Sequence, residues 1–430
     1  MKTFLGCIAD DLTGATDLAN NLVRAGMRVV QTIGVPEETA TVDADAIVVA
    51  LKSRTVPAAE AVDQSLEACR WLRMHGAEQI YFKICSTFDS SPRGNIGPVI
   101  EALMEELACD FSVVTPAFPE ARRTVFNGYL FVDGVLLSET GMRNHPLTPM
   151  TDANLVRVLQ GQLDPANERK VGLIDFRTVA QSSDGIRQQM DRLRGEGISI
   201  AIVDAINNED LMRLAAAVKG AALVTAASGL AIGLPANWGI APAVSPCGLP
   251  PVAGSKAIVS GSCSTATNAQ VMHFIESGGE AWQLRPVDLD ADSELQVAKS
   301  LDWAHTCWKS NPDIPLLVFS TAEPASVRAV QERLGVERAG ALIEYALSSI
   351  ARGLVERGAG QLILAGGETA GACIHALNIR QMQIGPQIDP GVPWCYAASP
   401  VSRNGNLHVA LKSGNFGSRD FFTRAFELIA

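Results

Sequence analysis

Residues 4–20 read FLGCIADDLTGATDLAN, and this stretch decides the predicted fold. A short apolar run, 4–9, ends in two adjacent carboxylates, Asp10 and Asp11. Apolar residues then recur at helical spacing over 12–23. This is the pattern of a buried strand that passes through a tight turn into a helix. Ligands of open α/β sheets bind beside the carboxyl ends of strands, so we expect this turn to form half of an active site.

The length and composition of the chain point to a globular protein of two or three domains. It has 430 residues, of which 47% are hydrophobic and 19% charged. No apolar run is long enough to span a membrane, and no signal-peptide core forms before the first acids. Nine cysteines without a C-x-x-C pair favour reduced thiols in a cytoplasmic protein. The net charge of −11 argues against nucleic acid as the main partner but leaves room for a local basic cleft.

Predicted strands and helices alternate along the whole chain. The predicted strands span 4–9, 46–51, 79–84, 111–115, 171–175, 198–204 and 222–225, and then 256–260, 316–320, 361–365 and 408–411, with a hairpin at 129–137. Such alternation indicates an α/β protein with mainly parallel sheets covered by helices. Between the two series, a segment rich in proline and glycine has no helical period. We therefore predict an N-terminal domain over 1–235, a linker or hinge over 236–255 and a C-terminal domain over 256–430.

The first series places acids, hydroxyls and cations directly after its strands. These residues are Asp10 and Asp11, Ser53 and Arg54, and Lys83 and Arg93. Arginine forks bind carboxylates and an aspartate can accept a hydroxyl proton, so the set suits a small hydroxylated acid. Plainer interpretations stay open. Asp11 could be a helix N-cap, and both arginines could be solvated surface charges.

The second series contains three turns rich in glycine and serine, each between a strand and a helix. They are Gly261–Ser264, Gly366–Gly371 and Ser413–Gly417. Glycine lets the backbone approach an anion closely, and the N–H groups of a helix start can hold it. Together the turns predict a phosphate cradle with room for a nucleotide, although short α/β loops also use glycine for other reasons. The sequence has neither a Walker A motif nor a full G-x-G-x-x-G, and its histidine spacing does not predict a zinc site.

Seven motifs carry a family resemblance that covers essentially the whole chain. They are IADDLTGATDLANNL (8–22), KICSTFDSSPRGNIG (83–97), PAFPEARRTVFNGYLFVDGVLL (116–137), HPLTPM (145–150), GSCSTATNAQ (261–270), GGETAG (366–371) and LKSGNFG (411–417). In this order they resemble the four-carbon acid sugar kinase family, and above all its 3-oxo-tetronate 4-kinase subgroup. Sister subgroups phosphorylate D-threonate or D-erythronate.

The resemblance implies an N-terminal domain that binds the sugar acid, a C-terminal domain that binds ATP, and an active site in the cleft between them. By motif, the catalytic residues would be Asp11 or Asp10, with Asp11 slightly favoured as the proton acceptor. The acid would contact Ser53, Arg54, Lys83 and Arg93. The nucleotide would contact Ser260 or Ser262, the turn Gly366, Gly367, Glu368 and Thr369, and Gly414. Mg²⁺ would bridge phosphate oxygens, with few protein ligands of its own.

The predicted reaction is phosphoryl transfer from ATP to the terminal 4-hydroxyl of a four-carbon keto acid. Cys85 stands where much of the family has aspartate, so a role for Asp89 is not carried over. A non-catalytic sensor that binds a sugar acid and a nicotinamide-dependent oxidoreductase are the rival hypotheses. The sequence leaves open the enantiomer, the need for the carbonyl group and the oligomeric state, and it is compatible with a homo-oligomer.

Overall fold

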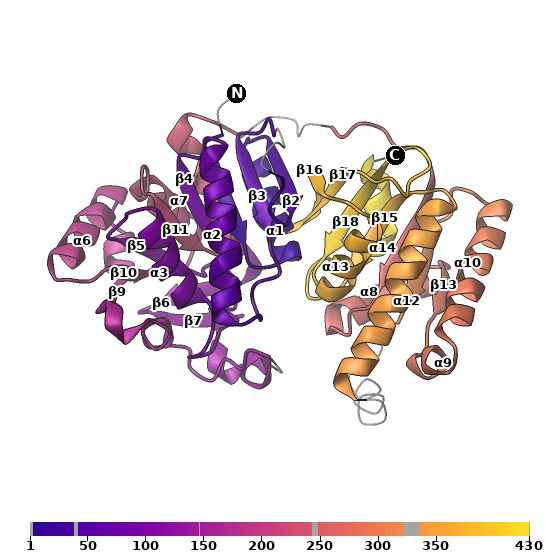
Figure 1. The fold of residues 1–430 in the computed structure, drawn as a ribbon, viewed down its shortest axis with the longest axis horizontal. Helices are drawn as coiled ribbons and strands as arrows, with labels where there is room; N and C mark the ends of the chain where they lie inside the picture. The colour runs from indigo at the N-terminus through magenta and orange to yellow at the C-terminus, as the bar shows by residue number, and fades with distance from the viewer. Residues whose placement is uncertain (1–2, 38–41, 146, 243–247, 321–334, 430) are drawn as a thin grey trace. The chain divides into compact units, whose positions relative to one another are not determined.

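The computed structural model describes the chain except residues 1–2, 38–41, 146, 243–247, 321–334 and 430 (Figure 1). Its contacts divide the chain into two compact units, Met1–Pro246 and Cys247–Ala430. This division falls inside the predicted linker of 236–255, of which 243–247 lie outside the described residues. A helix that the sequence suggests near Pro324 also lies outside them. The exact domain limits and the role of the linker as a hinge stay predictions.

The first unit is built on eight parallel strands in the order β2, β3, β1, β4, β11, β5, β10, β9. Their bounds are Val29–Ile33 (β2), Ala46–Ala50 (β3), Leu5–Ala9 (β1), Gln79–Lys83 (β4), Leu223–Ala226 (β11), Ser112–Thr115 (β5), Ile200–Val203 (β10) and Val171–Ile174 (β9). Every residue of β1, β3 and β4 is buried, as expected of strands covered on both faces.

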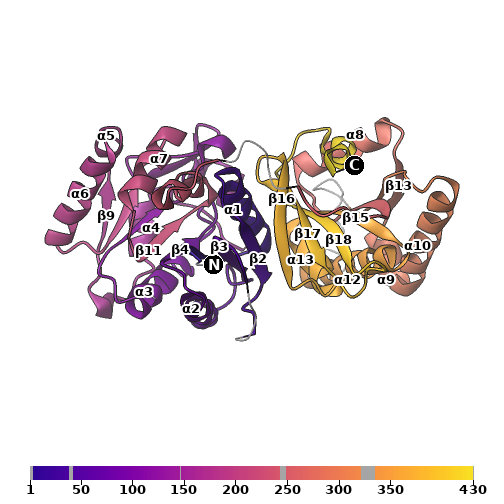
Figure 2. The same cartoon turned by 90° about the horizontal axis from the view of Figure 1, so that it is seen from above.

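Helices cover both faces of this sheet (Figure 2). Helices α2 and α3 lie on one face, and α1 and α7 on the other, where both pack against the short helix η5. The bounds are Leu12–Arg24 (α1), Ala58–Met74 (α2), Ile96–Glu106 (α3), Leu155–Gln160 (α4), Phe176–Val179 (α5), Ser183–Gly195 (α6), Asn208–Ala217 (α7) and Ser228–Gly233 (η5).

The strand register aligns the carboxyl ends of the central strands. Ala9 pairs with Ala50 on one side and with Lys83 on the other, and Lys83 pairs in turn with Ala226. The segments that follow these four residues therefore leave the same edge of the sheet side by side. This edge is where the sequence predicts the acid-binding residues.

A small antiparallel sheet in the first unit contains one hairpin that the sequence analysis predicted and one that it missed. The predicted turn joins Tyr129–Val132 (β7) to Val135–Leu136 (β8). The missed turn, Asn127-Gly128, joins β7 to Arg123–Phe126 (β6) and has positive φ at both residues. The Asp204 carboxylate fixes this turn, since it accepts the backbone N–H groups of Asn127 and Gly128 at 2.7 and 2.9 Å.

The second unit contains a mixed sheet in the order β13, β14, β12, β15, β18, β17, β16. The first five strands are parallel, and β17 and β16 complete the sheet antiparallel. The bounds are Glu280–Gln283 (β13), Leu316–Phe319 (β14), Ser255–Ser260 (β12), Ala359–Ala365 (β15), Asn406–Lys412 (β18), Val392–Ala398 (β17) and Gln381–Asp389 (β16). The two antiparallel strands were not predicted from the sequence.

Helices also lie on both faces of the second sheet (Figure 2). Their bounds are Thr265–Glu276 (α8), Pro286–Ala291 (α9), Ser293–Ser310 (α10), Val336–Glu356 (α12), Gly367–Ala376 (α13) and Phe421–Arg424 (α14). A core on the face of α8 and α14 includes the fully buried rings of Trp394, Phe421 and Phe422.

The predicted fold class, two α/β units with mainly parallel sheets, is confirmed. The eight cysteines among the described residues are free cysteines. Among the described helices, none combines the length and the apolar character needed to cross a bilayer.

Candidate functional site

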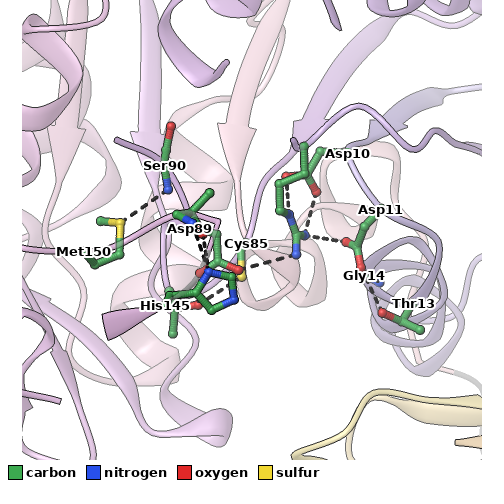
Figure 3. A network of polar contacts seen from close by, with 12 residues as sticks. Asp10, Asp11, Thr13, Gly14, Cys85, Asp89, Ser90, His145 and Met150 are labelled. Carbon is green, nitrogen blue, oxygen red and sulfur yellow. Dashed lines mark hydrogen bonds and ion pairs between the residues drawn. The ribbon is translucent and has the colours of Figure 1, made fainter. Parts of the chain in front are cut away.

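The turn between β1 and α1 is closed by the side chain of Asp11. Asp11 is the N-cap of α1, and its Oδ2 atom accepts the Gly14 N–H at 3.1 Å and the Thr13 hydroxyl at 2.8 Å (Figure 3). The N-cap interpretation is therefore confirmed. A Cβ atom at Gly14 would lie 2.2 Å from Asp11 Oδ1 and 2.4 Å from Lys83 Nζ. Only glycine at this position lets the carboxylate and the ammonium group approach the helix start together.

Arg54 joins the two adjacent carboxylates. Its Nε and Nη2 atoms bind Asp10 in a bidentate pair, both at 2.9 Å, and Nη2 also lies 2.5 Å from Asp11 Oδ1. Burial raises the pKa of Asp10, although Arg54 opposes the shift. Burial also acts to raise the pKa of Asp11, but Arg54 and Lys83 outweigh it and hold that pKa well below its usual range. Asp11 is therefore ionised at neutral pH.

Lys83 brings a second cation to the same turn. It is the last residue of β4 and is only 3% exposed, and its Nζ atom lies 3.9 Å from Asp11 Oδ1. A buried ammonium group is costly without a nearby negative charge. The register and the ion pair together explain why the carboxyl ends of β1 and β4 form one charged cluster.

The loop after β4 adds a third carboxylate to the cluster. Asp89 accepts the Thr87 hydroxyl at 2.6 Å, and Cys85 Sγ lies 3.1 Å from that hydroxyl. The other Asp89 oxygen lies 3.5 Å from Arg54 Nη1. Burial raises the pKa of the Cys85 thiol to about 12, so the cysteine is a neutral member of the site. Figure 3 shows Cys85 and Asp89 beside the Asp10–Asp11 turn.

Asn95 fixes the position of the Ser53-Arg54 segment. Its Nδ2 atom donates to the carbonyl oxygens of Ser53, Arg54 and Val56 at 2.7, 3.2 and 2.9 Å. The buried Ser53 also donates its N–H to the Asp10 carbonyl at 3.1 Å. Arg93, two residues before Asn95, is exposed and forms no ion pair with a described residue. The structure thus brings the predicted acid-binding residues to one edge and leaves Arg93 as the cation without a carboxylate partner there.

Met150, the last residue of the HPLTPM motif, contacts the same loop. Met150 Sδ accepts the Ser90 N–H at 3.3 Å, and His145 Nδ1 accepts the Thr148 N–H at 3.0 Å (Figure 3). Met150 therefore supports the loop that carries Asp89, and the His145 ring contacts Thr148.

A buried polar pair lies deeper along α1. Asp17 is 5% exposed, and the described residues provide no hydrogen-bond partner for its Oδ1 atom. Burial raises the pKa of Asp17 to about 6, while the neighbouring Ser228 and Lys83 oppose the shift. The sequence analysis missed both Asp17 and Ser228, although Asp17 follows Asp10 and Gly14 on one face of the helix and could have been noticed for that reason.

In the second unit, the three glycine-rich turns begin next to one another. Ser260 pairs with Ala365, and Ala365 pairs with Lys412, so β12, β15 and β18 end at one level. Gly366, the N-cap of α13, has φ of 114° and donates its N–H to the Lys412 carbonyl at 2.8 Å. The strand ends therefore bring together turns that are far apart in sequence.

Close packing requires glycine in two of these turns. A Cβ atom at Gly261 would lie 2.2 Å from Thr369 Oγ1, and one at Gly414 would lie 2.6 Å from Ser262 Oγ. Gly367 and Glu368 are exposed in the first turn of α13, whereas Ser260 and Thr369 are buried. All predicted nucleotide residues thus belong to one group of turns, with exposed backbone at the start of a helix.

Side chains that the sequence analysis did not assign hold the 413–417 turn. Gln270 Nε2 donates to the carbonyl oxygens of Phe416, Gly417 and Ser418 at 3.0, 2.9 and 3.0 Å. Ser264, the N-cap of α8, and Thr267 both donate hydroxyl hydrogens to the Gly414 carbonyl. These residues lie in or beside the GSCSTATNAQ motif, but sequence alone does not indicate that they meet a turn almost 150 residues away.

Comparisons with known proteins assign the two units to known domain families. A sugar-binding N-terminal domain family matches residues 5–234, and a nucleotide-binding C-terminal domain family matches residues 257–422. A 3-oxo-tetronate kinase of Pseudomonas fluorescens is 52% identical over all of this chain and 98% of its own length. A 3-oxo-tetronate kinase of Burkholderia multivorans is 49% identical, also over all of this chain and 98% of its own length. The chain belongs to the 3-oxo-tetronate kinase family.

Solved structures of related length share this fold. A Haemophilus influenzae protein is 41% identical, with a TM-score of 0.79 over 99% of this chain and 100% of its own. A protein from Salmonella typhimurium LT2 is 39% identical, with a TM-score of 0.87 over 98% of each chain. The family resemblance predicted from the motifs is confirmed, as is the assignment of the chain as a kinase with a nucleotide-binding domain. The roles of individual site residues stay predictions.

Proposed function

We propose that this chain transfers the γ-phosphoryl group of ATP to the 4-hydroxyl of 3-oxo-tetronate. The observation that carries the proposal is the charged cluster at the carboxyl edge of the first unit, in which Arg54 and Lys83 meet Asp10 and Asp11. The whole chain is also about half identical to relatives named 3-oxo-tetronate kinase. Cations and carboxylates together suit a substrate with a carboxylate at one end and a hydroxyl at the other.

The charges divide the work of binding the acid. Arg54 is already engaged by Asp10, so a bidentate grip on the substrate would require Asp10 to release it. We therefore propose that Arg54 chiefly holds the two aspartates through Nε and Nη2. Its Nη1 atom is then the one best suited to contact the substrate. Arg93, exposed and without an ion pair to a described residue, is the better candidate for the substrate carboxylate, together with Lys83.

Asp11 is the better candidate for the proton acceptor. Its side chain is 25% exposed, against 8% for Asp10. Because its pKa is low, it is ionised but weakly basic. Such a carboxylate orients the attacking hydroxyl and takes its proton as the bond to phosphorus forms, which suits a reaction governed by positioning and charge.

The glycine-rich turns of the second unit would hold the ATP phosphates. The N–H groups at the start of α13 and the close-packed Gly414 are the groups suited to this task. Mg²⁺ is also part of the proposal. The described residues contain no cluster of three or more histidine, cysteine or acidic side chains suited to a metal. A Mg²⁺ ion held mainly by phosphate oxygens and water needs no such cluster. Glu368 is the acidic residue within the 366–371 turn. When bound, Mg²⁺ would neutralise charge on the phosphates.

The proposal is tested by an ADP-release assay with ATP, Mg²⁺ and a panel of four-carbon acids. We expect kcat/KM for 3-oxo-tetronate to exceed the values for D-threonate and D-erythronate by at least 100-fold. Faster turnover of either sister acid would overturn the substrate assignment and leave the kinase assignment intact.

The sensor hypothesis is distinguished by thermal unfolding with each ligand added alone. A kinase of this family is stabilised by ATP as well as by the acid, because each ligand binds the folded state. Stabilisation by the acid alone, with no ADP formed from any acid, would favour the sensor.

A further inference from the structure

Lys412 occupies the point where the three glycine-rich turns meet. It ends β18, level with Ala365 at the end of β15, and its carbonyl accepts the Gly366 N–H at 2.8 Å. Its side chain is fully buried, with 0% of the residue exposed. Lys412 therefore contacts the 366–371 turn through its backbone, whereas its side chain contacts the 413–417 turn and Thr267 in α8.

The ammonium group of Lys412 lies in a cage of neutral oxygens. Nζ lies 2.8 Å from Thr267 Oγ1, and 3.1, 3.2 and 3.2 Å from the carbonyl oxygens of Ser413, Gly414 and Phe416. It forms no ion pair with a carboxylate of the described residues. The cage resembles the oxygen shell of a bound monovalent cation, with the cation tethered to the chain by the lysine stem.

A buried ammonium group without a carboxylate is an unfavourable way to fill space. Burial lowers the pKa of Lys412 to about 7, and an apolar side chain of similar length would avoid the desolvation. Four oxygen atoms around Nζ offset part of this cost, and the orientation of the peptides that supply three of them indicates a role for the ammonium group.

The cage sets the direction of the N–H groups in the 413–417 turn. In a trans peptide the N–H points away from the C=O of the same unit, so carbonyls turned toward Nζ direct the following N–H groups away from it. Those N–H groups belong to Gly414, Asn415 and Gly417, and none of them donates a hydrogen bond to a described residue. Outward N–H groups beside a helix start form an anion-binding concavity.

We propose that Lys412 is a positioning residue for the phosphates of the nucleotide. It acts as a tethered cation that holds the 413–417 turn with its carbonyls inward and its N–H groups toward the phosphates. Its charge gains a counterion only when the nucleotide binds. This inference rests on the proposed function, because it assigns a residue to the ATP site of that reaction.

The first test is Lys412→Met, which removes the charge and keeps the length of the side chain. We expect KM for ATP to rise at least tenfold, with KM for the acid unchanged within twofold. Lys256→Met is the matched control, since Lys256 lies near the amino end of the parallel strand β12, away from the turns at the carboxyl ends, and its KM values should stay at the wild-type level. A wild-type KM for ATP in a folded Lys412→Met protein would overturn the inference.

The second test asks whether the cage needs a cation. Lys412→Ala leaves room for a small ion, and ammonium or methylammonium chloride should lower its KM for ATP at least fivefold. Tetramethylammonium chloride at equal ionic strength should not do so, because it cannot donate hydrogen bonds to the cage. Equal effects of these salts, or no effect of any, would contradict the tethered-cation role.

A third pair of variants covers the case in which substitutions of Lys412 prevent folding. Thr267→Val removes the hydroxyl that contacts both Nζ and the Gly414 carbonyl, and Thr267→Ser keeps it. We expect a several-fold rise in KM for ATP in the valine variant and a near-normal value in the serine variant. Equal KM values for ATP in the valine and serine variants would overturn the inference. Failure of the wild type to form ADP or bind ATP would instead overturn the proposed function.

Discussion

Asp10 and Asp11 are neighbours in sequence but meet Arg54 differently. Asp10 takes the bidentate fork and is almost fully buried, whereas Asp11 shares one Nη2 contact and also caps α1. We predict that Asp11→Asn lowers kcat by 10²- to 10⁴-fold, in the range of general-base loss. KM for ATP should stay within twofold, because the nucleotide turns belong to the other unit. Steady-state kinetics measure both.

Asp10→Asn should instead act first on stability. It removes one charge from the bidentate pair and leaves Arg54 less compensated, which costs about 3 kcal/mol or more when a buried pair is broken. Urea unfolding of Asp10→Asn, Asp11→Asn and the exposed control Asp63→Asn compares the three positions. A larger loss of kcat in a stable Asp10→Asn protein than in Asp11→Asn would exchange the two roles.

Asp17 makes stability depend on pH in a direction opposite to that of a salt-bridged acid. Its pKa is raised from 3.8 to about 6, so the folded state binds this proton more tightly than the unfolded state. The contribution is complete below about pH 4 and is lost as the pH rises to about 6. Asp17→Asn should therefore raise the free energy of unfolding by up to about 3 kcal/mol at pH 8. The gain should be only about half as large at pH 5, which lies midway between the two pKa values. An equal change at both pH values would contradict the assignment.

Sequence identified the charged residues of the cluster but not their partners. The IADDLTGATD motif and the strand ends indicated Asp10, Asp11, Arg54 and Lys83. That Arg54 binds Asp10, and not solvent, depends on the parallel register of β1 and β3, which composition does not encode. Lys412 was seen only as part of a motif because its cage exists only in the folded state.

At the level of elements, the turn between β15 and α13 depends on the backbone of Gly366. Its φ of 114° is strained for any residue with a side chain, and a Cβ atom would lie 3.2 Å from the Ser262 N atom. We predict that Gly366→Ala raises KM for ATP more than tenfold, as measured by ADP release at saturating acid.

Gly371→Ala, within α13, is the matched control for this turn. A Cβ atom there meets nothing within 4 Å, and alanine favours a helix interior over glycine by about 1 kcal/mol. Its KM for ATP should be unchanged and its stability slightly higher. A similar loss of ATP binding in both variants would show that the helix, and not the turn, controls the nucleotide.

The elements that the sequence predicted are those with strong local patterns. Buried strands such as β1, β3 and β4 have continuous apolar runs, and the Asp133-Gly134 turn has clear hairpin chemistry. The strands β16 and β17 were missed because the segment between α13 and β18 mixes proline, glycine and polar residues. The Asn127-Gly128 turn was missed although its dipeptide is a strong hairpin signal.

For the whole molecule, two α/β units were predictable because each has its own series of strands and helices. Their assignment as sugar-binding and nucleotide-binding domains came from the family resemblance of the motifs. The change of composition over 236–255 gave the division between them. Sequence could not predict which segments of a unit meet, since strand order joins β12, β15 and β18 across about 150 residues. The site therefore required the fold, whereas the domain organisation did not.

The most direct test of the central claim is ³¹P NMR of a reaction containing the enzyme, ATP, Mg²⁺ and 3-oxo-tetronate. We predict one new phosphomonoester resonance, coupled to the C4 protons, that grows in step with ADP at a ratio of one to one. Inorganic phosphate as the only new product, or no ADP at all, would contradict the account.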